Sequence, residues 1–183
     1  MSKIRITGGE WRSRMIQVID APGLRPTPDR VRETLFNWLG QDMSGLTCLD
    51  LFAGSGILGF EAASRGAERV TFVERDPKVL AALRRNADVL GGGRLELVRD
   101  DAVKFLGLAA AQDRRYDLVF LDPPYRQGWL DQVWPGLAAV LRPGARVYVE
   151  AETGISPPSP WGIAKQGQAG QVFYHLLEQS EQA

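Results

Sequence analysis

Hydrophobic residues follow two alternating periods along most of the chain. Short runs rich in β-branched and aromatic residues, typical of buried strands, are each followed by a longer stretch with apolar residues at helical spacing. The predicted strands are residues 47–52, 69–74, 95–99 and 116–122, and the predicted helices are residues 57–65, 77–90, 103–111 and 128–141. This alternation predicts an α/β protein with a mostly parallel, doubly wound sheet, because right-handed crossovers place helices on both faces.

The C-terminal part of the chain carries two more predicted strands. Residues 145–151 and 171–178 have strand-like composition and flank a proline-rich loop at residues 156–160. Ligands of doubly wound sheets bind beyond the carboxyl ends of the strands. The residues that follow each predicted strand are therefore the candidates for a functional site.

The first 40 residues break the alternation. Strand-like residues on either side of the segment GGEWRSR predict a β-hairpin. Thr27 is expected to N-cap a helix that has Pro28 at its first position. Residues 1–40 are therefore predicted to form an extension too small for a core of its own, attached to a main domain of residues 41–183.

Composition places the chain among ordinary globular proteins. It has 183 residues, 44% of them hydrophobic, which suits one domain with a sizeable core. We expect a cytoplasmic protein without a membrane partner, since no apolar run reaches the roughly 18 residues of a membrane span and no signal-peptide core is present. Cys48 is the only cysteine, which excludes an intrachain disulfide and a cysteine-rich zinc site.

Charge is neutral in total but segregated along the chain. Lys plus Arg and Asp plus Glu number 22 each. Residues 1–32 nevertheless hold seven basic and three acidic side chains, so an acidic balance remains for the rest. A basic stretch of this length is either a solvated surface or a phosphate-binding one.

The first candidate motif is the segment DLFAGSG at residues 50–56, where the first predicted parallel strand gives way to a helix. Gly54, Gly56 and Gly59 satisfy the dinucleotide pattern G-x-G-x-x-G, so a nicotinamide-dependent oxidoreductase has to be considered. Asp50 favours a cationic amino-acid moiety instead, because a carboxylate at the strand end repels a diphosphate. A tight turn without a ligand is the third interpretation.

Two further acidic positions follow the next strands. Glu74 ends its strand and can accept the hydroxyl groups of a ribose, as in any Rossmann-like nucleoside site. Asp100 and Asp101 follow the third strand, where a side-chain acceptor meets an adenine amino group, and we predict Asp101 for this role. Either aspartate could instead cap the helix that follows.

The segment DPPY ends the fourth strand. Two prolines after Asp122 fix the backbone so that its carboxylate and neighbouring carbonyl groups face one way. Such a set of acceptors suits the two N–H donors of an exocyclic amino group on a base, and Tyr125 offers an aromatic face for stacking. A D-P-P turn without a function is the alternative.

These segments, in this order, resemble the class I S-adenosylmethionine-dependent methyltransferases that modify amino groups of bases. More closely, RITGGEWRSR, LRPTPDRVRETLFNWL, LDLFAGSGILGFEAASRGA and FLDPPY resemble the RsmD family of bacterial 16S rRNA guanine-N2 methyltransferases. The similarity covers most of residues 4–150 and is looser beyond them. Ser13 stands where the family usually has a glycine, and Pro28 where it often has a threonine.

The resemblance implies a Rossmann-like fold with a seven-stranded, mostly parallel sheet, and it assigns roles to individual residues. The target-base clamp is Asp122, Pro123, Pro124 and Tyr125. The implied contacts with S-adenosylmethionine are Asp50, Phe52, Ala53, Gly54, Ser55, Gly56, Glu74, Arg75, Asp101 and Ala102. The implied RNA contacts are Arg5, Arg12, Arg14, Arg25, Thr27, Arg30 and Arg32.

The predicted activity is direct methyl transfer from S-adenosylmethionine to guanine N2 of 16S rRNA, within a small-subunit particle. The products are the methylated base and S-adenosylhomocysteine, no metal is needed, and the protein is expected to be a monomer. Cys48 and His175 are predicted to be structural. Alternatives are an adenine-N6 or protein-amide methyltransferase, a nicotinamide-dependent oxidoreductase, and a non-catalytic RNA-binding module.

Overall fold

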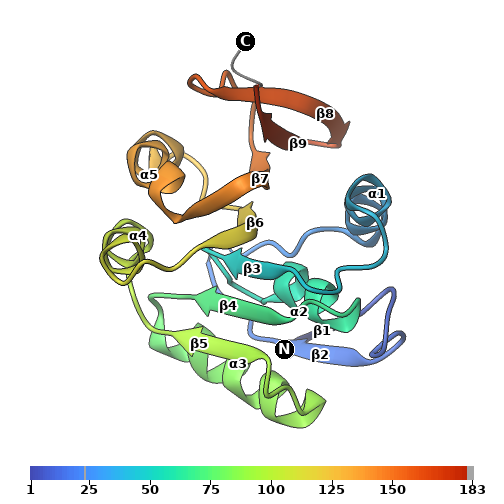
Figure 1. The fold of residues 1–183 in the computed structure, drawn as a ribbon. Coiled ribbons are helices and arrows are strands. Elements are labelled where there is room, and N and C mark those ends of the chain that lie inside the picture. Colours follow the sequence, from blue (N-terminus) through green and yellow to red (C-terminus); the bar gives the residue numbers. More distant parts are fainter. Residues whose placement is uncertain (23, 181–183) are drawn as a thin grey trace.

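In the computed structural model, which describes residues 1–22 and 24–180, a seven-stranded sheet forms the centre of the molecule (Figure 1). The strand order is β5-β4-β3-β6-β7-β9-β8. The strands are β3 (Thr47–Asp50), β4 (Arg69–Val73), β5 (Leu95–Val98), β6 (Tyr116–Leu121), β7 (Leu141–Ala151), β8 (Trp161–Ala169) and β9 (Val172–Gln179). Strands β3 to β7 pair in parallel, whereas β9 runs antiparallel to both β7 and β8. The prediction of a mostly parallel sheet is confirmed.

Helices cover both faces of this sheet (Figure 1). They are α1 (Asp29–Leu39), α2 (Ile57–Ser64), α3 (Pro77–Leu90), α4 (Ala102–Ala111) and α5 (Trp129–Leu137). One core lies between the sheet and α4 and α5, and a second lies between the opposite face and α1, α2 and α3. None of these helices has the length and apolar character needed to cross a membrane.

The N-terminal extension packs into the second of these cores. Strands β1 (Ser2–Arg5) and β2 (Met15–Val18) form the predicted hairpin, and Ile6, Trp11 and Ile16 are buried in the same cluster as Phe60 and Phe72. Helix α1 packs on β9, where the Trp38 and Tyr174 rings stack with their centroids 5.3 Å apart. The extension is therefore fixed against the sheet by apolar contacts.

The turn of the hairpin explains how Ser13 replaces a glycine. Its φ angle is 71°, in the left-handed region that glycine adopts without steric cost. Serine thus takes a conformation that suits glycine and accepts a small strain.

Three sequence predictions about elements were wrong. Strand β8 was missed because it is an edge strand, and most of its side chains are exposed, so it has no apolar pattern. The predicted helix 128–141 ends at Leu137, and after a short 3₁₀ turn β7 begins at Leu141. Thr27 does not cap α1: the cap residue is Pro28, and the Thr27 hydroxyl has another partner described below.

The chain order creates a switch point between β3 and β6. From β3 the chain proceeds outward through β4 and β5, then returns to β6 on the other side of β3. Adjacent crossovers leave in opposite directions here and open a crevice at the carboxyl ends of the two strands. Asp50 ends β3 and Asp122 follows β6, so the fold brings these two carboxyl groups to one crevice.

Candidate active site

A cavity of about 840 Å³ occupies this crevice. Its carboxylate-bearing lining residues are Asp50, Glu74, Asp100, Asp122, Glu150 and Glu152. Its guanidinium-bearing lining residues are Arg25, Arg75 and Arg126. The excess of carboxyl groups favours a cationic ligand and disfavours a diphosphate.

The glycine turn links β3 to α2 at the cavity floor. Gly54 and Ser55 line the cavity, whereas Gly56 does not. Gly56 has a φ of 79°, and a Cβ atom there would lie 2.3 Å from Leu83. Gly59 packs against β4, since a Cβ atom would lie 2.4 Å from the Phe72 ring. The prediction that Gly56 contacts a ligand is thus not supported, because this glycine serves the turn and the packing of α2.

Asp50 is a buried carboxyl group at the end of β3. Its side chain is 2% exposed, and Oδ2 accepts a hydrogen bond of 3.2 Å from the Gly59 N–H. Burial raises the pKa of Asp50 to about 8, and the negative charges of Glu74 and Glu150 add to the effect. A cation beside Asp50 would favour its ionised form.

Glu74 joins the end of β4 to the glycine turn. Its Oε1 accepts from the Gly54 N–H at 3.0 Å, and its Oε2 accepts from the Asp76 N–H at 2.9 Å. Each oxygen keeps a second lone pair, so the carboxylate can also accept two hydroxyl groups of a ribose.

An aromatic wall stands next to Glu74. The Arg75 guanidinium lies 5.4 Å from the ring centroid of Trp129, and the Phe52 ring is edge-on to that indole with centroids 5.6 Å apart. All three side chains line the cavity, and the two aromatic rings offer apolar faces to a base. Sequence reasoning missed Trp129, although an indole at the start of a helix just after DPPY was a usable signal.

Asp100 and Asp101 take different positions after β5. Asp101 N-caps α4 through hydrogen bonds of 2.9 and 3.1 Å from the Val103 and Lys104 N–H groups. Asp100 and Ala102 line the cavity, and Asp101 does not. The helix-cap alternative holds for Asp101, and its position outside the cavity lining does not support the predicted adenine contact.

The four residues of the DPPY segment all line the cavity. Asp122 is half-buried next to Glu150. Burial raises the pKa of Asp122 well above its usual range, and the Glu150 charge raises it further. Tyr125 presents its partly exposed ring beside them, so acceptors and an aromatic face meet at one end of the cavity.

Glu150 is a functional candidate that sequence reasoning missed. It lies in β7, is 3% exposed and lines the cavity. Its Oε1 accepts hydrogen bonds from the Thr27 hydroxyl at 2.6 Å and from the Tyr148 hydroxyl at 2.7 Å. The signal was an apolar strand that ends in a carboxylate, as at Asp50 and Glu74.

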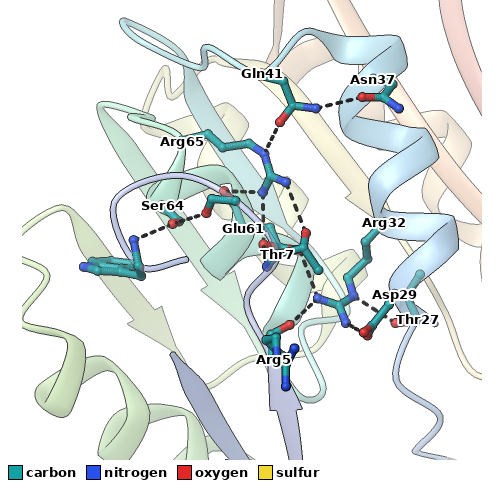
Figure 2. A network of polar contacts seen from close by, with 12 residues as sticks. Arg5, Thr7, Thr27, Asp29, Arg32, Asn37, Gln41, Glu61, Ser64 and Arg65 are labelled. Atoms are coloured by element: carbon teal, nitrogen blue, oxygen red, sulfur yellow. Dashed lines mark hydrogen bonds and ion pairs between the residues drawn. The ribbon is translucent and has the colours of Figure 1, made fainter. Parts of the chain in front are cut away.

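Most of the predicted RNA-contacting arginines are exposed, and Arg32 is the exception. Arg5, Arg12, Arg14, Arg25 and Arg30 are exposed. Arg32 is 0% exposed and forms an ion pair of 2.9 Å with Glu61, so the prediction that it contacts RNA was wrong (Figure 2). Arg32 falls at helical spacing with Leu35, Phe36 and Leu39, which places it on the buried face of α1.

The exposed arginines lie at two ends of the molecule. Arg25 lines the cavity, and Arg30 is in the first turn of α1 beside it. The hairpin turn lies at the opposite edge of the sheet, because Arg14 donates to the Val89 carbonyl near the end of α3 and the Trp11 N–H donates to Ser64 at the end of α2. Thr27 also lines the cavity, but its hydroxyl donates to Glu150.

Cys48 and His175 take no part in the cavity. Burial raises the pKa of the Cys48 thiol to about 12, so it is protonated and unreactive. His175 is buried on β9 with Nδ1 3.1 Å from the Val149 carbonyl oxygen. In the described part of the chain, no group of three or more His, Cys, Asp or Glu side chains is arranged to hold a metal ion.

Comparison with known proteins identifies relatives over nearly the whole chain. The family described as "Conserved hypothetical protein 95" matches residues 4–178. The chain is 43% identical over 185 residues to ribosomal RNA small subunit methyltransferase D of Escherichia coli (strain K12), covering 98% of this chain and 92% of that protein.

Solved structures agree with this similarity. The structure of yhhF from Escherichia coli, described as a proposed methyltransferase, superposes with a TM-score of 0.86 and 43% identity, covering 99% of this chain and 100% of that one. A more distant structure, SMU.776, described as a proposed methyltransferase in complex with SAH, has a TM-score of 0.66 and 16% identity. It covers 81% of this chain and 48% of that one, and it shares the fold alone.

Proposed function

The chain belongs to the RsmD family of methyltransferases, described as "Conserved hypothetical protein 95", and we propose that it methylates guanine N2 in 16S ribosomal RNA with S-adenosylmethionine as methyl donor. The observation that supports this most is the acidic cavity, in which the DPPY segment after β6 faces the glycine turn after β3. The relatives named as ribosomal RNA small subunit methyltransferases support the RNA substrate.

The residues of the cavity fit S-adenosylmethionine. This ligand carries a sulfonium and an ammonium group against one carboxylate, so it is a net cation, and the lining has six carboxyl groups against three guanidiniums. When bound, it supplies an electrophilic methyl group and leaves as S-adenosylhomocysteine. Asp50 and the Gly54–Ser55 backbone would hold its amino-acid part, Glu74 its ribose, and Asp100 with the Phe52–Trp129 wall its adenine.

The DPPY segment would position the target base. Guanine N2 is a poor nucleophile because its lone pair is delocalised into the ring. The Asp122 carboxylate would accept from the amino group, orient its lone pair and stabilise the positive charge that grows on N2, while Tyr125 stacks on the base. As the methyl group passes from sulfur to N2, the proton that N2 loses would go to Asp122 or to water. Positioning of this kind lowers a barrier by about 7–11 kcal/mol in favourable cases.

The exposed arginines would bind phosphates of the RNA. Arg25 and Arg30 lie beside the cavity and would hold the backbone near the flipped-out base. Arg5, Arg12 and Arg14 are exposed on the hairpin, apart from these two, and would contact more distant phosphates. We take residues 1–40 as the RNA-facing part of a cytoplasmic monomer that acts on a small-subunit particle.

Methyl transfer to particles that lack the modification tests this function. The purified protein, small-subunit particles from cells without the gene, and labelled S-adenosylmethionine are incubated, and the RNA is digested and analysed by mass spectrometry. We expect N2-methylguanosine as the product. N6-methyladenosine, or no methylated nucleoside, would contradict the proposal.

The clamp is tested in the same assay by Asp122→Asn. We expect kcat to fall by roughly 100- to 1000-fold, because the carboxylate acts on charge that develops in the transition state. The affinity for S-adenosylhomocysteine should stay within a few-fold of wild type. Asp88→Asn, the same substitution on the exposed face of α3, serves as the control and should retain full activity.

A further inference from the structure

Glu150 and Asp122 form a pair at the carboxyl ends of two neighbouring strands. Leu121 of β6 is in register with Val149 of β7, and the strands are parallel. The next residues, Asp122 and Glu150, are therefore side by side at the same edge of the sheet, and both line the cavity. The clamp thus contains a second carboxyl group besides that of the DPPY segment.

Glu150 is held rigidly on one oxygen. Thr27 and Tyr148 both donate to Oε1, at 2.6 and 2.7 Å. Arg32 supports Thr27 by donating to its carbonyl oxygen at 3.1 Å (Figure 2). Within residues 1–22 and 24–180, no amide, hydroxyl or guanidinium group donates to Oε2, and the Glu150 carboxyl group is otherwise in hydrogen-bonding contact with that of Asp122. One oxygen therefore orients the side chain, and the other has no N–H donor and can accept one from a ligand.

Glu150 has no ion pair with a cationic side chain in the described part of the chain. A buried carboxylate without a cation is costly unless donors satisfy it. The hydrogen bonds from Thr27 and Tyr148 favour its ionised form, while burial raises the pKa of both Glu150 and Asp122. N–H donors of a bound base would favour the ionised forms of both carboxyl groups.

The two purines differ at the edge that such a pair would face. In guanine, the N1–H donor is next to the N2 amino group, so the edge presents adjacent donors. In adenine, the N6 amino group is next to N1, which is an acceptor with a lone pair. Two adjacent carboxylates therefore complement the two adjacent donors of guanine. With adenine, one carboxylate would face the N1 lone pair, and two acceptors repel each other.

Resting on the proposed methyl transfer to a base, we propose that Glu150 accepts the N1–H of the target guanine while Asp122 accepts from its N2 amino group. Glu150 is thus the residue that selects guanine over adenine. Thr27 and Tyr148 are positioning residues that turn the free oxygen of Glu150 to the base. Adenine-N6 and guanine-N2 methylation would both need the DPPY segment, so that segment does not distinguish the two bases. In this proposal, a residue outside the segment, Glu150, makes the distinction.

The experiment uses 2-aminopurine at the methylated position of an RNA in a reconstituted small-subunit particle. This base keeps the C2 amino group but has an acceptor in place of the N1–H. Wild-type protein should methylate guanine with a kcat/KM about 100-fold higher than 2-aminopurine.

The variant Glu150→Gln should reduce this preference for guanine. Because Thr27 and Tyr148 donate to one oxygen, the amide oxygen of glutamine takes that place, and its NH₂ group faces the base as a donor. The ratio of kcat/KM for guanine to that for 2-aminopurine should be at least about tenfold lower in the variant than in the wild type. Comparing the ratios of the two proteins cancels any difference in intrinsic reactivity between the two bases. Glu178→Gln, on the exposed side of β9, is the matched control and should keep the wild-type preference.

The outcomes separate this inference from the proposed function. A wild-type protein that methylates neither base contradicts both. A wild-type protein that methylates guanine and 2-aminopurine equally well contradicts only the role of Glu150, and this holds even where the glutamine variant does not fold. A folded Glu150→Gln protein, judged by its affinity for S-adenosylhomocysteine, that keeps the wild-type preference also contradicts it.

Discussion

At the residue scale, the site is built from carboxyl groups at the ends of strands. Asp50, Glu74, Asp122 and Glu150 sit at or just after the carboxyl ends of β3, β4, β6 and β7. Asp50 and Glu150 are almost fully buried, and in the described residues neither forms an ion pair with Lys or Arg. Burial of such groups costs free energy, which a ligand that brings positive charge or N–H donors offsets.

Asp50 should make ligand binding depend on pH. Its pKa of about 8 in the folded protein is above the value near 4 of the unfolded chain, so between these pH values the folded state binds one more proton. The contribution of Asp50 to stability is therefore largest at low pH and is lost as pH rises toward 8. The ammonium group that S-adenosylmethionine and S-adenosylhomocysteine both carry would favour the ionised form of Asp50, so binding releases this proton.

The affinity for S-adenosylhomocysteine should accordingly rise between pH 6 and pH 8, by up to about tenfold per pH unit. Isothermal titration calorimetry at several pH values measures this rise. Asp50→Asn keeps an acceptor for the Gly59 N–H, so it should fold, bind more weakly at pH 8 and lose most of the dependence on pH. An unchanged slope in the asparagine variant would show that another group releases the proton.

At the element scale, a buried polar network fixes the N-terminal extension to the sheet (Figure 2). Glu61 of α2 accepts from Arg32 of α1 at 2.9 Å and from Arg65 at 3.0 Å, and it also accepts from the Thr7 N–H and hydroxyl. Arg32 also donates hydrogen bonds to the carbonyl oxygens of Arg5 and Thr27. One carboxylate thus ties the hairpin, α1 and the segment with Thr27 to the helix that follows the glycine turn.

Glu61→Gln should destabilise the fold strongly. It leaves the Arg32 and Arg65 guanidiniums, which are 0% and 3% exposed, without a buried counter-charge. The expected loss in the free energy of unfolding is about 3–5 kcal/mol, measured by urea denaturation. Asp29→Asn removes the exposed partner of Arg32 and should cost at most about 1 kcal/mol. Equal losses in the two variants would contradict the role of Glu61.

The basic surface at the start of α1 should contribute to RNA binding through phosphates. Neutralising Arg25 and Arg30 together to Gln should weaken binding to small-subunit particles and reduce the slope of log affinity against log salt by up to about 2. The matched control is neutralisation of Arg115 and Arg142, which lie near the amino ends of β6 and β7, on the opposite edge from the cavity. A slope that changes equally in both pairs would point to general charge rather than a defined surface.

At the scale of the whole molecule, two buried cores on the faces of one sheet hold the cavity open at the switch point. The N-terminal extension closes one side of this cavity through Arg25 and Thr27, and the β8–β9 hairpin closes another through Gln168 and Phe173. The cavity is therefore formed by segments that are far apart in the sequence and not by one motif.

The acidic lining should discriminate between nucleoside ligands. At 100 times its dissociation constant, S-adenosylhomocysteine should stabilise the protein by about 2.7 kcal/mol, which corresponds to a rise in Tm of roughly 5–10 °C. NAD at the same concentration should leave Tm unchanged, because its diphosphate would face the carboxyl groups of the cavity. A comparable shift with NAD would favour the oxidoreductase alternative.

Periodicity and strand-end chemistry were enough to predict the parallel sheet, the glycine turn and the position of Asp122 at the cavity. These features are local: a strand or a helix shows its buried face in the spacing of its own apolar residues, and a carboxylate after a buried strand stands at the edge of the sheet. Asp101 shows the limit, since a helix cap and a ligand contact look alike until the direction of the side chain is known.

The roles of Arg32, Thr27, Glu150 and β8 depend on partners far away in the chain. Thr27 meets Glu150 across 123 positions, and Arg32 meets Glu61 across 29. Whether a polar side chain faces solvent, a ligand or a buried partner depends on which other elements pack against it. The residue type alone does not determine this. The free oxygen of Glu150 beside Asp122, on which the choice of guanine is proposed to rest, exists only because β6 and β7 pair in this register.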